Sequence, residues 1–165
     1  MIKLTTPLTK EKIASLKKGD AVLLSGTIFT ARDAAHKKMA EAFASGKPLP
    51  LRGEVIYYAG PCPTKPGEII GSVGPTTSYR MDAYAELFAK NGCLATIGKG
   101  KRSAEAQNAI KTNGGVHFEA IGGAGAYYKH CVKKAETYLY PELGAEAVYK
   151  LEVVDFPIIV GIISD

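Results

Sequence analysis

The amino-acid sequence predicts one α/β domain, because short apolar runs alternate with amphipathic segments of helical period along the whole chain. Its 165 residues suit a single domain with a real hydrophobic core, and we expect that domain to cover residues 1–165. Hydrophobic residues make up 46% of the chain, which excludes an intrinsically disordered protein. The longest apolar run, residues 156–163, is far shorter than the roughly 20 residues that span a membrane. We therefore expect a soluble, cytoplasmic protein with no membrane partner.

Three segments, residues 9–18, 33–45 and 81–91, place their apolar residues on one face of a helix, as in a helix that packs against a sheet. Thr9 suits the N-cap of the first, since its hydroxyl can accept from the free backbone N–H groups of the first turn. Gly92 suits the end of the third, because glycine adopts positive φ without strain. We expect the helices over residues 9–18, 33–45, 81–91, 103–111 and 127–138.

The segments between these helices predict strands. Residues 21–25 form a continuous apolar run that stops at Gly26, which is typical of a buried strand. Residues 116–121 alternate in polarity, as in a half-buried strand. We expect the strands over residues 21–25, 54–59, 69–73, 93–97, 116–121, 148–153 and 158–163. Their order is compatible with one sheet or with two packed sheets.

The three cysteines, Cys62, Cys93 and Cys131, form no CxxC pair and lie far apart along the chain. This spacing fits neither a disulfide framework, nor a zinc site, nor a sequence-local iron–sulfur motif. His117 and His130 also lack metal ligands at a suitable spacing. We therefore expect no metal site built from this chain, and we interpret the cysteines as small apolar side chains.

The net charge of +5, from 21 Lys and Arg against 16 Asp and Glu, is mild and permits an anionic ligand. One hypothesis is a stand-alone basic module that binds RNA or an acidic metabolite, favoured by the lysine-rich segment 129–134. Nucleic-acid binding, however, favours a basic stripe with exposed aromatic side chains, whereas the basic residues here are interleaved with acidic ones. We expect no nucleic-acid partner.

Three glycine-bounded loops, residues 25–33, 74–80 and 98–103, each follow a predicted strand and lead into a predicted helix. Free backbone N–H groups at the start of a helix attract anions. The carboxyl ends of neighbouring strands also converge on one crevice in α/β sheets. These loops therefore predict a shared anion site.

Each of these loops carries one cation: Arg32, Arg80 and Lys99. A guanidinium donates two parallel hydrogen bonds to one carboxylate, so a small dicarboxylate would engage all three cations. The alternative is that the two arginines are solvated helix residues or form ion pairs with Asp33 and Asp82.

Two further residue types near these loops bear on chemistry. Thr76 and Thr77 follow Pro75 at a helix entrance, where a threonine most often serves as the N-cap. A threonine hydroxyl acts as a general base only if neighbouring cations stabilise its deprotonated form. His36 lies one helical turn after Arg32 and can share its helix face and help to shape the site.

These loops resemble three signatures of one enzyme family. Residues 26–36, GTIFTARDAAH, resemble a GT-hydrophobic-x-TARDxAH signature, residues 74–81, GPTTSYRM, a GPTTSxRM signature, and residues 98–100 a GKG signature. The chain is thereby similar to the beta subunit, or carboxyl-terminal domain, of iron–sulfur class I fumarate hydratases and L-tartrate dehydratases. The likeness runs over nearly the whole chain, from residues 4–7 to residues 154–157.

The resemblance implies a swivelling β/β/α domain, in which a mixed or parallel sheet with helices is stacked on a second sheet. It implies reversible hydration of fumarate to (S)-malate, with dehydration of L-tartrate to oxaloacetate as the alternative; residues 150–157 look closer to fumarases. It also implies a partner alpha subunit in a hetero-oligomer, whose three cysteines hold a four-iron, four-sulfur cluster. The open iron of that cluster would bind the substrate hydroxyl and one carboxylate as a Lewis acid.

Residue by residue, the resemblance makes Arg32, Arg80 and Lys99 the clamps on the substrate carboxylates. It makes Thr76 the residue that abstracts the proton, with its neighbour Thr77 as the alternative in register. His36 and Asp33 would have supporting roles. No residue of this chain would bind the metal.

Overall fold

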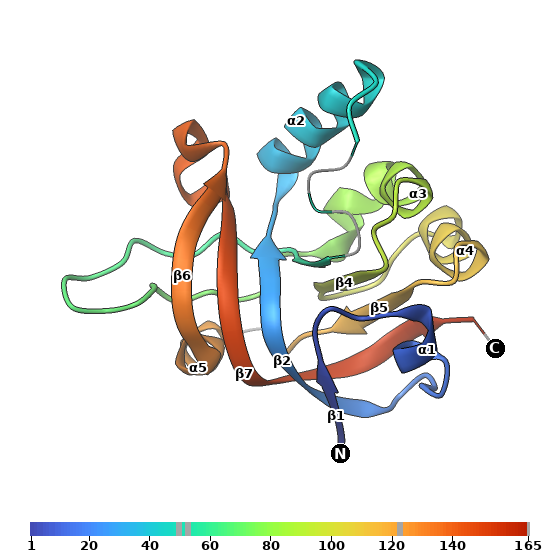
Figure 1. The fold of residues 1–165 in the computed structure, drawn as a ribbon, viewed down its shortest axis with the longest axis horizontal. Coiled ribbons are helices and arrows are strands. Elements are labelled where there is room, and N and C mark those ends of the chain that lie inside the picture. The colour runs from blue at the N-terminus through green and yellow to red at the C-terminus, as the bar shows by residue number, and fades with distance from the viewer. Residues whose placement is uncertain (49–50, 52–53, 122–123, 165) are drawn as a thin grey trace.

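The computed structural model describes residues 1–48, 51, 54–121 and 124–164, and within them the chain forms a mixed sheet flanked by helices (Figure 1). The strands are β1 (Ile2–Thr5), β2 (Ala21–Thr30), β3 (Val55–Tyr57), β4 (Ala95–Gly98), β5 (Val116–Glu119), β6 (Val132–Leu139) and β7 (Val148–Ile163). The α-helices are α1 (Lys10–Ile13), α2 (Asp33–Ala44), α3 (Asp82–Lys90), α4 (Ala104–Thr112) and α5 (Gly125–Cys131). Two 3₁₀ turns, η1 (Ser78–Met81) and η2 (Pro141–Glu146), complete the set. The predicted α/β class is confirmed.

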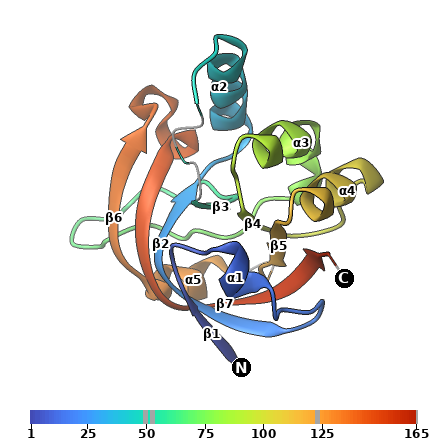
Figure 2. The same cartoon turned by 45° about the vertical axis from the view of Figure 1, so that its right-hand side comes forward.

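Strands β1 to β5 are parallel neighbours in the order β1-β2-β3-β4-β5. Helices α2, α3 and α4 connect β2 to β3, β3 to β4 and β4 to β5, and they lie along one side of the sheet (Figure 2). Because the connected strands are parallel, each of these helices begins at the same edge of the sheet, beyond the carboxyl ends of the strands.

The long strand β7 closes the sheet on itself. It runs antiparallel to β2, β5 and β6, so the pairings β2–β3–β4–β5–β7–β2 form a ring. The register of β2 with β7 shifts between Leu24 and Gly26, where Gly26 has φ +112° and an added Cβ would lie 2.1 Å from Thr6 Oγ1. The expected sheet and the second sheet stacked on it are thus parts of one curled sheet. The strand that was expected to stop at Gly26 continues to Thr30, with Gly26 at the irregularity.

Several sequence-based boundaries are wrong for non-local reasons. The segments 148–153 and 158–163 belong to one strand, β7, because its ladder continues from β6 to β5. The helix expected over 127–138 ends at Cys131, and the chain continues as the strand β6. Strand β6 is mostly exposed, so its residues lack the alternation of apolar and polar side chains that indicates a strand.

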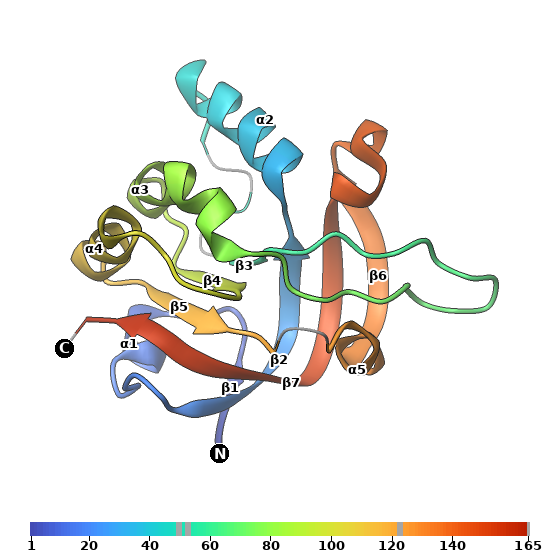
Figure 3. The same ribbon diagram turned by 180° about the vertical axis from the view of Figure 1, so that it is seen from behind.

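The segment 69–73 is not a strand either, and β1 was not anticipated. Residues 61–73 extend from the sheet and pass beyond β6 (Figure 3). Ile70 and Val73 are nevertheless buried in the core, which explains their apolar character. The first helix is shorter than expected and covers only Lys10–Ile13, capped by the Thr9 hydroxyl as predicted.

Two hydrophobic clusters hold these elements together. The larger one fills the ring of strands, where Tyr57, Tyr128 and Phe156 pack ring against ring. The second joins β2 and β3 to α2 and α3 through residues such as Met39 and Phe88. It attaches both helices to the sheet, and so places the loops from which they start. None of the described helices has the length and apolar character needed to cross a membrane.

Candidate active site

The three predicted loops meet at the carboxyl ends of β2, β3 and β4. Thr30 pairs with Tyr57 and Tyr57 pairs with Ile97, so the chain segments that leave these strands start side by side. The Thr76 N–H donates to the Tyr58 carbonyl at 2.6 Å, which returns the second loop to the end of β3. The expected convergence of the loops is therefore found in the structure.

The second and third loops are joined directly. Thr77 and Lys99 form an isolated parallel bridge, and the Ser78 N–H donates to the Lys99 carbonyl at 2.8 Å. The side chain of Ser78 is buried against Gly98, where an added Cβ would lie 2.1 Å from Ser78 Oγ. A side chain at Gly98 would force the two loops apart.

The first and second loops are joined by an ion pair. Arg80 Nε donates to Asp33 Oδ2 at 3.1 Å, and Arg80 Nη2 lies 2.8 Å from the same oxygen. The Arg80 side chain is 48% exposed and that of Asp33 is 40% exposed. The alternative of ion pairs with Asp33 and Asp82 is thus found in part: Arg80 pairs with Asp33, whereas Asp82 pairs with Arg102.

Arg32 lies at the start of α2, and its side chain packs against the backbone of Gly60, close to η2. An added Cβ at Gly60 would lie 2.8 Å from Arg32 Cδ and 2.7 Å from the Ala145 carbonyl oxygen, so a glycine is needed to leave room for the arginine. Arg32 Nε and Asp33 Oδ1 are buried and have no hydrogen-bond partner among the described residues. Unsatisfied polar groups are costly inside a protein, and a ligand that matched them would be favoured.

The backbone N–H groups at two helix starts are already occupied by carboxylates of the protein. The Ala34 N–H at the start of α2 donates to Glu146 Oε1 at 3.2 Å. The Ser103 N–H at the start of α4 donates to Asp82 Oδ2 at 2.7 Å. For these two N–H groups, the expectation that they are free for a ligand is therefore wrong.

His36 supports the first loop from within the core. Its Nδ1 donates to the Arg32 carbonyl at 2.8 Å, and its ring stacks on Phe88 with 4.7 Å between the ring centroids. Burial lowers the pKa of His36 to about 4, so the imidazole is neutral at physiological pH. The predicted supporting residue thus holds the turn that carries Arg32.

Proteins with sequences similar to this chain include fumarate hydratases and a tartrate dehydratase subunit. The family model described as Fumarase C-terminus matches residues 1–165. The chain belongs to this family. It is 42% identical to "Fumarate hydratase 2" of Leishmania major over 162 residues, which cover 94% of this chain and 28% of that protein.

Two further relatives differ in how much of their length the match covers. The chain is 44% identical to "Fumarate hydratase class I, aerobic" of Escherichia coli over 138 residues, which cover 81% of this chain and 25% of the relative. It is 41% identical to "Putative L(+)-tartrate dehydratase subunit beta" of Methanocaldococcus jannaschii over 165 residues, which cover 95% of this chain and 85% of the relative. This Fumarase C-terminus chain thus spans about a quarter of the fumarate hydratases and most of the tartrate dehydratase subunit.

The cysteines of this Fumarase C-terminus chain do not form a cluster site. Cys62 is exposed in the extended segment, Cys93 precedes β4 and Cys131 ends α5. Burial raises the pKa of the Cys93 thiol to about 12, which opposes the thiolate that a metal requires. Among the described residues, no three His, Cys, Asp or Glu side chains are placed to hold a metal ion. These residues do not fit an iron–sulfur cluster.

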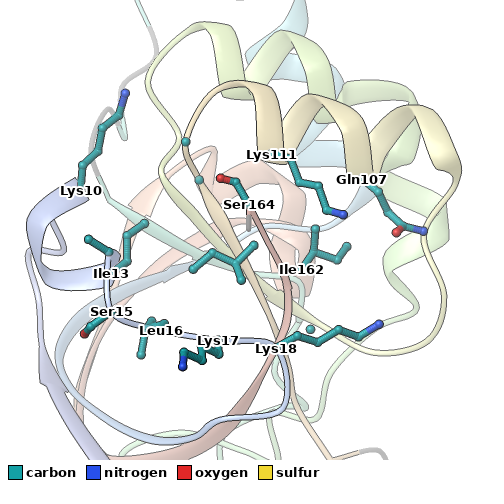
Figure 4. A pocket seen from close by; sticks show the side chains of 15 residues that line it. Lys10, Ile13, Ser15, Leu16, Lys17, Lys18, Gln107, Lys111, Ile162 and Ser164 are labelled. Atoms are coloured by element: carbon teal, nitrogen blue, oxygen red, sulfur yellow. The ribbon is translucent and has the colours of Figure 1, made fainter.

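A cavity of about 1040 Å³ lies at the other end of the parallel strands, between α1, α4 and the end of β7 (Figure 4). Its apolar floor includes Ile13, Leu16 and Ile162, and no aspartate or glutamate is among the described residues that line it. Its rim carries four lysines, Lys10, Lys17, Lys18 and Lys111. None of the motif residues reaches this cavity, so it is separate from the candidate active site.

Sequence reasoning missed the buried polar residues beneath the loops. Arg102 and Asp82 form an ion pair at 2.8 Å with side chains only 1% and 10% exposed. His117 is also buried, within hydrogen-bond distance of Ser78 and Thr96. The sequence carried a signal for two of these residues: Arg102 lies two residues after the GKG signature, and Asp82 lies two residues after Arg80.

Proposed function

We propose that this chain forms part of the active site of a hydro-lyase that adds water reversibly to fumarate and gives (S)-malate. The observation that carries the proposal is the meeting of three cation-bearing loops beside Thr76 and Thr77. The names of the relatives support the reaction class, since they are fumarate hydratases and a tartrate dehydratase.

Arg32, Arg80 and Lys99 hold the substrate carboxylates. Removal of a proton from the carbon next to a carboxylate moves negative charge onto that carboxylate. Cations that contact it stabilise the transition state more than the ground state, and so raise the turnover number. Arginine suits this task because its planar fork matches both carboxylate oxygens.

Thr76 abstracts the proton, with Thr77 as the alternative. The backbone of Thr76 is held by Tyr58, which restricts the position of its hydroxyl. Thr77 precedes η1, yet its side chain makes no capping hydrogen bond, so the ordinary structural role of a threonine at this place is not used. Neighbouring cations lower the free energy of an alkoxide, which is what either residue needs to act as a base.

A partner subunit supplies the four-iron, four-sulfur cluster. This part of the proposal is supported by the words "subunit beta" in the name of one relative. The short share of the fumarate hydratases that the chain covers also agrees with a separate cluster-binding part. The assembled enzyme is then a hetero-oligomer.

Dehydration of L-tartrate to oxaloacetate is the second candidate function. The relative that this chain covers over 85% of its length is named a tartrate dehydratase subunit. Tartrate and malate share two carboxylates, so the same cations serve either substrate, and contacts to the additional hydroxyl decide between them.

The decisive experiment is anaerobic co-production of this chain with its cluster-binding partner, followed by assays with fumarate, (S)-malate and L-tartrate. We expect reversible hydration of fumarate, and no activity from this chain alone. A higher kcat/KM for L-tartrate than for malate would select the second candidate. An iron-loaded complex that is inactive on all three compounds would contradict the proposal.

A further inference from the structure

We propose that Arg102 is a positioning residue, which holds the segments carrying Thr76, Arg80 and Lys99 at the spacing that catalysis requires. This inference rests on the proposed function, because it assigns Arg102 to the same reaction. Arg102 lies three residues after Lys99, is 6% exposed and does not belong to the predicted clamps. Its contacts reach each of the three segments.

The contact with Asp82 joins the Lys99 loop to the Arg80 turn. Arg102 Nε donates to Asp82 Oδ1 at 2.8 Å, and the Ser103 N–H donates to Asp82 Oδ2 at 2.7 Å. Both carboxylate oxygens of Asp82 are therefore used by the chain that follows Lys99. Since Asp82 directly follows η1, which contains Arg80, this double contact sets the distance between two of the clamps.

The contact with Tyr58 extends the same network to the proposed base. Arg102 Nη1 donates to the Tyr58 hydroxyl at 3.0 Å, and the guanidinium carbon lies 5.1 Å from the centre of the Tyr58 ring. The backbone carbonyl of Tyr58 accepts the Thr76 N–H at 2.6 Å. Tyr58 thus links the Arg102 guanidinium, through its side chain, to the backbone of Thr76, through its carbonyl.

His117 on β5 completes the network beneath the loops. It lies 3.5 Å from Arg102 Nη1 through Nδ1, and Nε2 lies 3.3 Å from Ser78 Oγ. Burial, with a smaller effect of the Arg102 charge, lowers the pKa of His117 well below its usual value, so the ring stays neutral beside the guanidinium. A neutral His117 can remain next to a buried cation and keep Ser78 in place against Lys99.

Lysine cannot replace this arginine. The contacts to Asp82 and Tyr58 leave two different nitrogen atoms of one rigid plane, and an ammonium group is a single point. Arg102 Nη2 is buried and has no partner among the described residues, and Arg102, Tyr58 and Thr96 are among the residues that line a cavity of about 20 Å³. A buried arginine with an unpaired donor contributes little to the free energy of folding. Its role in holding the three segments in place therefore explains it better than a gain in stability.

The test uses the assembled enzyme with Arg102→Lys, Arg102→Met and Tyr58→Phe. We expect kcat to fall by about 10- to 100-fold in Arg102→Lys, because small displacements of catalytic groups are costly, and KM to rise by a smaller factor. Tyr58→Phe, which removes only the hydroxyl, should lose less. Lys101→Met, which alters the exposed neighbour on the same loop, is the matched control and should keep wild-type kcat.

A second readout does not depend on activity. Hydrogen exchange of the amides of Thr76 and Ser78 should accelerate in Arg102→Lys, while exchange in β6 and β7 stays unchanged. The effects of Arg102→Met and Asp82→Asn on kcat should combine less than multiplicatively, because both remove the same contact. If Arg102→Met fails to fold, Arg102→Lys and Tyr58→Phe still decide the matter.

Two outcomes would overturn the inference. One is a folded Arg102→Lys enzyme whose kcat matches that of the wild type. The other is an exchange rate that rises uniformly over the whole chain, which is what a purely structural role predicts. An inactive wild-type enzyme with accelerated exchange at Thr76 and Ser78 in the variant would instead contradict the proposed function and leave the network intact.

Discussion

Arg80 and Asp33, which lie on different loops, form an ion pair in which two guanidinium nitrogens share one carboxylate oxygen, Oδ2, at 2.8 and 3.1 Å. The other oxygen, Oδ1, is buried without a partner among the described residues. The pair presents one edge of Arg80 to Asp33. Under the proposed function, the remaining donor edge of the guanidinium would bind a substrate carboxylate.

Asp33→Asn should weaken substrate binding with little effect on stability. Without the aspartate charge, Arg80 loses the partner that orients it, and we expect KM for the dicarboxylate to rise several-fold. The free energy of unfolding should change by less than about 1 kcal/mol, because exposed ion pairs contribute little. Steady-state kinetics and urea unfolding measure both effects.

Glu86→Gln is the control for this prediction, since it removes the exposed pair of Glu86 with Lys90 on α3 and should leave KM unchanged. A lower KM in Asp33→Asn would mean that Asp33 competes with the substrate for Arg80.

Thr76→Ala should reduce kcat by about 10²- to 10⁴-fold, the range typical of a lost general base, and should change KM far less. Arg80→Ala should damage both kcat and KM, because a clamp contacts the substrate before and during the reaction. Thr112→Ala, at an exposed threonine at the end of α4, controls for the substitution itself. Near-normal turnover in Thr76→Ala would transfer the role of base to Thr77 or to the partner subunit.

Gly60→Ala should act like a mutation of Arg32. The new methyl group would lie 2.8 Å from Arg32 Cδ and 2.7 Å from the Ala145 carbonyl oxygen, so the arginine or the backbone must move. We expect KM to rise about tenfold and stability to fall by about 1–3 kcal/mol. Gly46→Ala is the control: Gly46 has φ +79° and no atom within 4 Å of an added Cβ, so it should lose stability without a change in KM. Equal KM values in the two variants would contradict the role of Gly60.

The stability of the chain should depend on pH through His36. Its pKa is about 4 in the folded chain and 6.5 when exposed, mainly because it is buried. The unfolded chain therefore takes up a proton first, so this contribution to stability is complete above pH 6.5 and is lost as the pH falls towards 4. A shift of this size corresponds to about 3 kcal/mol.

Urea unfolding at pH 7 and pH 5 tests this prediction. His36→Gln should show a smaller loss of unfolding free energy between these values than the wild type. His130→Gln, which changes an exposed histidine on α5, should behave like the wild type. The same loss in His36→Gln as in the wild type would assign the pH dependence to other groups, such as His117.

Much of the fold could be predicted because its signals are local. The Thr9 cap, the helical periods of α2 and α3 and the apolar runs of β2 and β4 all depend on residues close together in the sequence. Strand β6 could not be predicted, since its exposed residues form a strand only because β7 offers a ladder. The continuous β7 could not be predicted either, because its two halves pair with different neighbours.

The sequence alone determined which chemical groups stand after each strand: Arg32, Thr76 and Lys99 follow from motifs of a few residues. Only the tertiary structure decided how those groups are held. It paired Arg80 with Asp33 and not with Asp82. It brought the carboxylates of Glu146 and Asp82 to backbone N–H groups at two helix starts. It also buried Arg102 and His36 beneath the loops. The physical reason is that charge pairing and burial depend on distance in space. Residues far apart in the chain become neighbours only when the parallel strands bring their carboxyl ends together.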